Sequence, residues 1–290
     1  MKYTAKELKE NVNVSKTSPL KDVVILSMEM LGLFVLIYLA LGFSIDAMVT
    51  HLPQDAEHRL STLFVHHLVD KPPMPTEQSL QTFLERLITV LPQESQKKYQ
   101  VHVVLSKQTN ALALPGGHIV ILSGLLKELQ SENELAFVLG HEVGHFVNRD
   151  HLRRLGRGLV LSTVSIFLTG LDSNLTQFLM RSLVGIELKF SREQELKADL
   201  QALELLNKYY GHVAGATDFF ERIATKNSHS RLSYYFATHP YPQERVIALQ
   251  EKIQKNNYLL REKIAINQVL ENLPETTAEI SLEDFINQRQ

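Results

Sequence analysis

The sequence predicts an α+β protein that is mostly helical, with a small β-hairpin or sheet beside a central helix and one transmembrane helix before the folded domain. Three observations support this class. An apolar run from Val23 to Phe43 contains a single charge, a strand–turn–strand pattern surrounds Pro115-Gly116-Gly117, and apolar residues recur at helical spacing from Leu135 to Phe146. Helical and strand periodicities in separate segments are typical of α+β folds.

The composition narrows the classes of protein and of metal site. The chain has 290 residues, of which 44% are hydrophobic and 21% charged, as is usual for a globular protein of one or two domains. The net charge of -2 gives no sign of a nucleic-acid partner. Because the chain has no cysteine, disulfides and thiolate metal sites are excluded, and a zinc ion would need histidine and carboxylate ligands.

The amino-terminal region predicts a polar tail over 1–22 and a transmembrane helix or signal anchor over 23–49. About 20 apolar residues suffice to cross a bilayer. Two alternatives stay open, a cleaved signal peptide ending near 40–42 and a buried core helix. The lysines precede the apolar run, so the positive-inside rule predicts a cytoplasmic amino terminus and a folded domain on the outer, periplasmic or extracytoplasmic side.

The central helix is expected from about Glu132 to Arg149. Ser131 and Glu134 have the spacing of a capping box, in which each side chain accepts a backbone N–H at the helix start. No proline interrupts the segment, and its apolar residues follow the helical period.

An H-E-x-x-H motif, His141-Glu142-Val143-Gly144-His145, lies on this helix. Histidines four residues apart lie on one helix face, so both imidazoles can bind one metal ion. Glu142 would then lie beside a metal-bound water, which is the arrangement of a zinc-dependent hydrolase.

A third ligand is expected in the helical segment Ser191 to Tyr210, where Glu195 and Asp199 share one face. A carboxylate would complete a two-His, one-Glu site and leave a fourth position for water. Taken alone, this acidic pair also fits a solvated helix face, and only its combination with the H-E-x-x-H motif favours the metal site.

The flanking segments predict a helix over 78–91, a strand over 99–105 and a hairpin over 110–122, whose edge could pair with an extended peptide. A plain structural hairpin is the alternative. The apolar segments 159–171 and 178–186 predict core or membrane-surface helices, with a second membrane-inserted pair left open.

Thr238-His239-Pro240 predicts a rigid loop before a helix that starts at Pro242. Residue reasoning alone leaves His239 undecided between an active-site residue and a loop residue. The acidic end is expected to be a separate tail over 266–290, which leaves 50–265 as the folded domain.

Four sequence blocks in the same order resemble the M48 peptidases, the zinc metallopeptidases that include the HtpX, Ste24 and Oma1 types. The resemblance covers about 101–245 and implies a zincin-like (gluzincin) metallopeptidase domain. The blocks are Asn110-Ala-Leu-Ala-Leu-Pro-Gly-Gly-His118, His141-Glu-Val-Gly-His145, Ser191-Arg-Glu-Gln-Glu-Leu-Lys-Ala-Asp199 and Thr238-His-Pro240.

The resemblance also implies roles for individual residues. One Zn²⁺ per subunit would be held by His141, His145 and Glu195, with Glu142 as the general base. His239 would lie near the site and stabilise the transition state, and Asp199 would orient a histidine ligand. Substrate would lie along the strand that contains Asn110, Ala111, Leu112 and Ala113.

Two features depart from the family pattern. Leu112 stands where the family often has an aromatic residue, and the single amino-terminal span differs from the multi-span HtpX and Ste24 types. We therefore expect a single-span, membrane-anchored zinc metalloendopeptidase that acts on protein or peptide substrates at a lipid bilayer, in the quality control of membrane or envelope proteins. The alternative is a membrane-tethered binding or chaperone-like module with a structural or latent zinc site. The sequence does not predict the oligomeric state.

Overall fold

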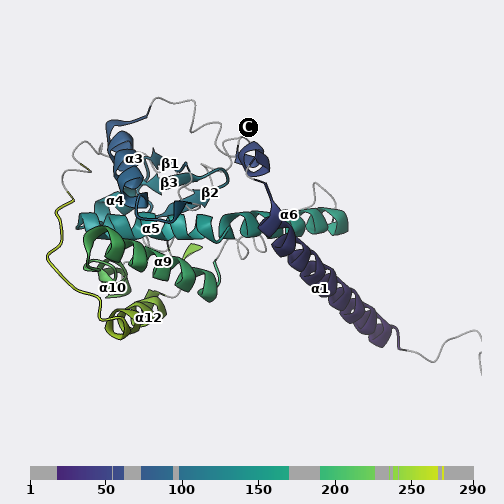
Figure 1. Cartoon of the computed structure of the whole chain (residues 1–290). Helices are drawn as coiled ribbons and strands as arrows, with labels where there is room; N and C mark the ends of the chain where they lie inside the picture. The colour runs from purple at the N-terminus through teal and green to yellow at the C-terminus, as the bar shows by residue number, and fades with distance from the viewer. Residues whose placement is uncertain are drawn as a thin grey trace, which may run out of the picture.

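The structure is a computed structural model that describes residues 18–53, 55–61, 73–93, 98–169, 190–225, 235, 238–240, 242–266 and 270. A folded body of helices around a small sheet lies at one end of a long helix, α1, which extends away from it (Figure 1). The predicted segment 178–186, most of the connector after residue 61 and nearly all of the tail over 266–290 lie outside the described residues.

Helix α1 (Pro19–His51) contains the apolar run and exceeds the predicted 23–49 at both ends. Proline is well suited to the first helical turn, where its missing N–H has no partner to lose. The helix is long and apolar enough to cross a membrane, and its most apolar stretch is not buried inside the molecule. This exposure disfavours the buried core helix as an explanation of the segment.

The sheet has three strands, β1 (Gln100–Val104), β2 (Ala111–Leu114) and β3 (His118–Leu122), in the order β1-β3-β2. The predicted antiparallel hairpin of β2 and β3 is present, and Gly116 and Gly117 take φ values of 85° and 86° in its turn. The parallel pairing of β1 with β3 was not predicted. It leaves β2 at an edge of the sheet.

Helices surround this sheet, and α5 lies centrally between the sheet and α9 (Figure 1). The predicted helix over 78–91 is present as α3. It starts three residues earlier, because Pro75 is suited to the first helical turn, and it ends three residues earlier, at Ile88. Besides the short helical segment 55–61, the helices after α1 with described bounds are α3 (Pro75–Ile88), α4 (Ser123–Glu128), α5 (Glu132–Val147), α6 (Asp150–Thr169), α9 (Arg192–Tyr210), α10 (Asp218–Thr225) and α12 (Pro242–Lys255).

The ends of α5 differ from the prediction in two ways. Ser131 accepts the Glu134 N–H at 3.2 Å as expected, but the Glu134 carboxylate accepts the N–H of Gln130 instead of that of Ser131. The buried carboxylate also pairs with Arg222, a charge partner distant in sequence. The helix ends at Val147 instead of Arg149, because Arg149 takes a left-handed conformation with φ 56°.

Two glycines let α5 and α9 approach closely. A Cβ atom at Gly144 would lie 2.9 Å from the Ala198 Cα, and one at Gly140 would lie 3.3 Å from the Ala202 Cα. These contacts put the H-E-x-x-H face of α5 against the face of α9 that carries the acidic residues.

Candidate metal centre

Four side chains from three separate segments converge between α5 and α9. His141 and His145 come from α5, Glu195 from α9, and His239 from the loop before α12. One ligand atom from each lies within 4.8 Å of the others, and all four residues are buried. The two histidines and the glutamate predicted as ligands are therefore brought together, and His239 joins them.

The two α5 histidines are held by carboxylates on the side away from this centre. His141 Nδ1 lies 2.9 Å from Asp199 Oδ1, and His145 Nδ1 lies 3.1 Å from Asp150 Oδ2. Because a carboxylate accepts hydrogen bonds, both Nδ1 atoms act as donors, and in the neutral rings, the form that binds a metal ion, both Nε2 atoms are left as acceptors. The two Nε2 atoms lie 3.1 Å apart.

Glu195 completes a set of acceptors suited to a cation. Its Oε2 lies 3.7 Å from His141 Nε2, and its Oε1 lies 3.6 Å from His145 Nε2. A tetrahedral zinc ion with ligands at 2.0–2.1 Å places those ligand atoms roughly 3.3 Å from one another. Acceptors facing one another at this spacing in a buried site fit a zinc ion.

Glu142 lies next to this set and carries no competing bond. Both of its carboxylate oxygens are buried and have no hydrogen-bond partner in the part of the chain that the structure describes. Oε1 lies 3.7 Å from His239 Nε2. A buried carboxylate without a partner is costly, so this one is available to a water or substrate proton.

His239 lies within the centre itself, in contact with two of the predicted ligands. Its Nδ1 lies 3.0 Å from Glu195 Oε1 and 3.3 Å from His141 Nε2. The ring stacks on Tyr235 with a centroid distance of 4.8 Å. Residue reasoning alone left this histidine undecided, and the family resemblance implied a position near the site. The structure places it among the candidate ligands.

Arg245, from the first turns of α12, is a site residue that sequence reasoning missed. Its guanidinium donates to both oxygens of Asp199, at 2.7 and 2.6 Å, and its Nη1 lies 2.5 Å from Glu195 Oε2. Arg245 thus holds the third candidate ligand and the carboxylate that orients His141. The signal in the sequence was an arginine in the first turn of the helix predicted to start at Pro242, just after the Thr238-His239-Pro240 loop.

Asp150 was also missed, although it holds His145 as Asp199 holds His141. Its second oxygen accepts a hydrogen bond from Gln194 Nε2 at 3.0 Å. The signal in the sequence was a carboxylate five residues beyond His145 at the expected helix end.

At Glu195 and His145, burial and the neighbouring side chains shift the pKa in opposite directions. Burial raises the pKa of Glu195, but Arg245 and His239 outweigh it and hold that pKa well below its usual range. Burial lowers the pKa of His145, but hydrogen bonds to Asp150 and Glu195 outweigh it and raise that pKa to about 9. Burial lowers the pKa of His141. The site therefore holds Glu195 as an anion, the form that binds a cation.

The predicted substrate strand lies beside the centre. Ala111, Leu112 and Ala113 belong to the edge strand β2, which contacts α5. Asn110 immediately precedes β2 and is buried, and its Oδ1 accepts a hydrogen bond from the Thr238 hydroxyl at 3.2 Å. Asn110 therefore ties the edge strand to the loop that carries His239.

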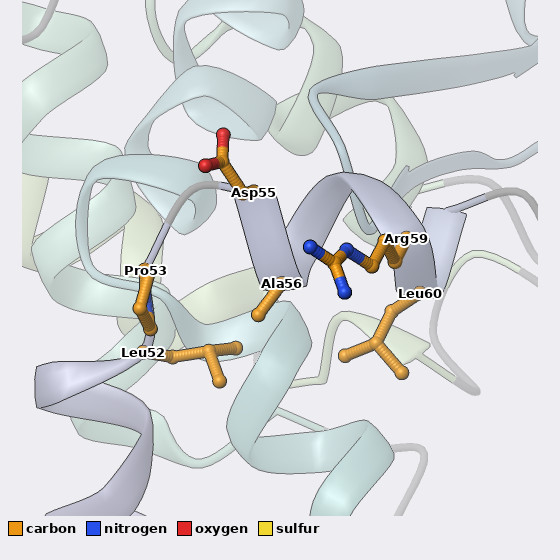
Figure 2. A pocket seen from close by; sticks show the side chains of 6 residues that line it. All are labelled: Leu52, Pro53, Asp55, Ala56, Arg59 and Leu60. Carbon is orange, nitrogen blue, oxygen red and sulfur yellow. The ribbon is translucent and has the colours of Figure 1, made fainter.

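A separate open pocket lies where α1 meets the helical segment 55–61 (Figure 2). None of the residues that line it belongs to the metal cluster, so it is distinct from the candidate site. Its lining residues are Leu52, Pro53, Asp55, Ala56, Arg59 and Leu60.

Comparison with known proteins agrees with this geometry. The chain is 30% identical over 182 residues to the mitochondrial metalloendopeptidase OMA1 of Schizosaccharomyces pombe, which covers 61% of this chain and 53% of that protein. It is 30% identical over 158 residues to the metalloprotease LoiP of Escherichia coli. That alignment covers 52% of this chain and 61% of LoiP. It is 35% identical over 153 residues to the mitochondrial metalloendopeptidase OMA1 of Arabidopsis thaliana. That alignment covers 51% of this chain and 30% of the plant protein.

The chain thus spans less than two thirds of the length of these relatives. A family model described as "Peptidase family M48" matches residues 75–253, a range that includes all four members of the metal cluster. Because this match covers more than half of the chain, the protein belongs to peptidase family M48.

Proposed function

We propose that this chain is a membrane-anchored, zinc-dependent endopeptidase that cleaves peptide bonds of protein substrates. His141, His145 and Glu195 would hold one zinc ion, and Asp199 would orient His141. The observation that carries this proposal is the convergence of three acceptor groups beside Glu142, whose buried carboxylate has no hydrogen-bond partner among the described residues. When bound, zinc at such a site acidifies water and polarises a carbonyl group.

Glu142 acts as the general base in this mechanism. Its free carboxylate takes a proton from the attacking water and then delivers it to the leaving amine nitrogen. His239 faces Glu195 through Nδ1 and Glu142 through Nε2. With both ring nitrogens protonated, it can donate from Nδ1 to Glu195 and from Nε2 to the oxyanion that develops at the scissile carbonyl. Arg245 keeps Glu195 and Asp199 ionised and in place.

The substrate would bind in an extended conformation along β2. This strand lies at an edge of the sheet, where backbone groups can pair with another strand. Residues 110–113 would supply those contacts beside Glu142. Such recognition relies on the substrate backbone and therefore favours unfolded segments.

We propose that α1 anchors the chain in a lipid bilayer, with the amino terminus in the cytoplasm and the folded domain on the outer side. The exposed apolar surface of α1 supports the anchor, and the lysines before it support the orientation. Protease accessibility of a tag at the carboxyl terminus in intact cells tests the orientation. The predicted outcome is digestion of the tag, and protection would reverse the assignment.

Proteins of the membrane or envelope are the substrate class that an anchored enzyme of this kind would reach. The experiment is a quantitative proteomic comparison of cells with the wild-type chain and with Glu142→Gln. We expect a set of membrane-associated proteins to accumulate uncleaved in the variant. If Glu142→Gln fully rescues a deletion strain, the chain acts by binding and the endopeptidase proposal is wrong.

A further inference from the structure

The corner between α5 and α6 joins the metal centre to the segment that leaves the membrane helix. Three consecutive residues, Arg149, Asp150 and His151, form this corner immediately after the H-E-x-x-H helix. Their side chains bind three different partners. In Figure 1, α6 crosses α1 close to the carboxyl end of α1.

Arg149 binds the end of α1. Its Nη1 donates to the carbonyl oxygens of Val49 and Leu52, at 2.6 and 2.8 Å. The last carbonyls of a helix have no partner within it and carry partial negative charge, so a guanidinium there is stabilising. The left-handed conformation of Arg149, with φ 56°, turns the chain at this corner.

Asp150 turns in the opposite direction, toward the metal centre. It is buried, and its carboxylate accepts the His145 Nδ1 hydrogen at 3.1 Å. Its other oxygen accepts a hydrogen bond from Gln194, the neighbour of Glu195 in sequence. The position of Asp150 therefore bears on His145 directly and on the start of α9.

His151 binds the helical segment that follows α1. Its Nε2 lies 3.0 Å from Glu57 Oε1, and both residues are buried. The same Glu57 oxygen accepts the N–H of Gly116, in the turn between β2 and β3, at 3.3 Å. Glu57 thus contacts both the corner and the hairpin of the proposed substrate strand.

Close packing strengthens this junction further along α6. A Cβ atom at Gly156 would lie 2.6 Å from Ile45 Cγ2, so the two helices touch closely at that point. Arg157 pairs with Asp46 at 2.5 Å. Residues 45–53 and 55–57, which we call the exit segment, therefore pack on α6 and on the corner.

We propose that the exit segment positions His145 for metal binding, with Arg149 and Glu57 as the positioning residues that hold the corner carrying Asp150. This inference rests on the metal site proposed above. The packing of the exit segment against α6 and the corner then sets the metal affinity and the geometry of the metal centre. A carboxylate that orients a metal-binding histidine contributes 10–100-fold to metal affinity, and residues that fix that carboxylate act through it.

The test uses the full-length chain in detergent micelles and measures zinc affinity by competition with a chromophoric chelator. We expect Arg149→Gly and Glu57→Ala each to weaken zinc binding about 10-fold, and Asp150→Asn at least as much. Glycine accepts a positive φ, so Arg149→Gly removes the guanidinium without straining the corner. Lys263→Ala removes the exposed ion pair with Asp218, remote from the corner, and is expected to leave zinc affinity unchanged.

Two further readouts separate positioning from a general loss of structure. Glu57→Gln keeps an acceptor oxygen for Gly116 and His151, so it should restore affinity to within about threefold of wild type, a loss well below the tenfold expected for an orienting contact. The visible spectrum of the Co²⁺-substituted chain should change in Arg149→Gly and Glu57→Ala while the far-ultraviolet circular dichroism stays that of the wild type.

The outcomes distinguish this inference from the proposed function. Wild-type zinc affinity in both Arg149→Gly and Glu57→Ala, with weakened binding in Asp150→Asn, would overturn the role of the exit segment and leave the metal site intact. Unfolding of both variants without metal would assign these residues a purely structural role and also overturn it. Failure of the wild-type chain to bind zinc would overturn the proposed function and this inference together.

Discussion

At the scale of residues, the centre is built from charges that compensate one another away from water. Arg245 and Glu195 contact each other at 2.5 Å, and Arg245 forms a two-point pair with Asp199. Burial of any one of these charges alone would be costly, so the three are stable only together. The candidate ligand set therefore depends on Arg245, which contacts two carboxylates and belongs to neither of the segments predicted to bind metal.

Removal of Arg245 tests this dependence. We expect Arg245→Ala to lower the free energy of unfolding of the metal-free chain by about 3–5 kcal/mol, because two buried carboxylates lose their cation. Arg245→Lys keeps the charge but not the two-point geometry, so an intermediate loss is expected. Denaturant unfolding monitored by circular dichroism measures both effects.

Arg192→Ala serves as the matched control for that experiment. Arg192 pairs with Glu244 at 3.1 Å, and both side chains are more than half exposed. Removal of an exposed pair should cost less than about 1 kcal/mol. Equal losses in Arg192→Ala and Arg245→Ala would contradict the account of the buried triad.

At the scale of elements, the contact between α5 and α9 sets the distance between the two histidines and the glutamate. Gly144 lies between His141 and His145, where a Cβ would meet the Ala198 Cα at 2.9 Å. Ala198 is on the same helix as Glu195, one turn away. The glycine in the H-E-x-x-H motif therefore allows Glu195 to approach the two histidines closely.

The substitution Gly144→Ala should separate these helices. We expect a loss of about 1–3 kcal/mol in unfolding free energy from overpacking, together with weaker zinc binding as Glu195 moves away. Gly158→Ala is the matched control, since nothing lies within 4 Å of a Cβ there. The control should gain up to about 1 kcal/mol from helix propensity. Unchanged zinc affinity in Gly144→Ala would show that this contact does not set the ligand geometry.

Elements with local signals were predictable from the sequence. Helix α9 has its capping box at Ser191 and Gln194, and the hairpin has its turn glycines, so both lie close to the expected residues. The parallel pairing of β1 with β3 has no local signal, because it joins strands separated by another strand.

The same limit explains which parts of the centre were found. The two histidines are fixed by helical spacing on one element, and Glu195 lies on a recognisable second helix. Arg245 and Asp150 contact residues on other helices. No periodic pattern in the sequence indicates which residue such a charge will contact. The half-formed capping box at Glu134 has the same origin, because the carboxylate binds Arg222, 88 residues away.

At the scale of the whole molecule, the chain combines a long apolar helix with a folded body that encloses the candidate metal centre. The apolar side chains of α1 are exposed along its length, among them Leu33 and Leu36. Water does not solvate such a surface favourably, whereas a bilayer does. If α1 lies in a bilayer as proposed, the exit segment would hold the body close to the membrane surface.

Charges in the middle of α1 should release the chain from membranes. An arginine at the centre of a span costs roughly 2.5–3.5 kcal/mol on insertion scales. We expect the double variant Leu33→Arg and Leu36→Arg to lose co-flotation with lipid vesicles, which the wild-type chain should show. Leu259→Arg, at an exposed position on the folded body, should float like the wild type. Flotation of the double variant at the wild-type level would contradict the anchor.

One zinc ion and Glu142 are together proposed to cleave peptide bonds, and stoichiometric reactivation tests this mechanism most directly. The full-length chain is stripped of metal, titrated with zinc and assayed on an unfolded protein substrate, beside Glu142→Gln treated in the same way. We predict that cleavage by the wild-type chain rises with zinc up to one ion per chain. Glu142→Gln should bind the same single ion and remain inactive. Full cleavage by the stripped wild-type chain, or cleavage by Glu142→Gln at the wild-type rate, would contradict the account.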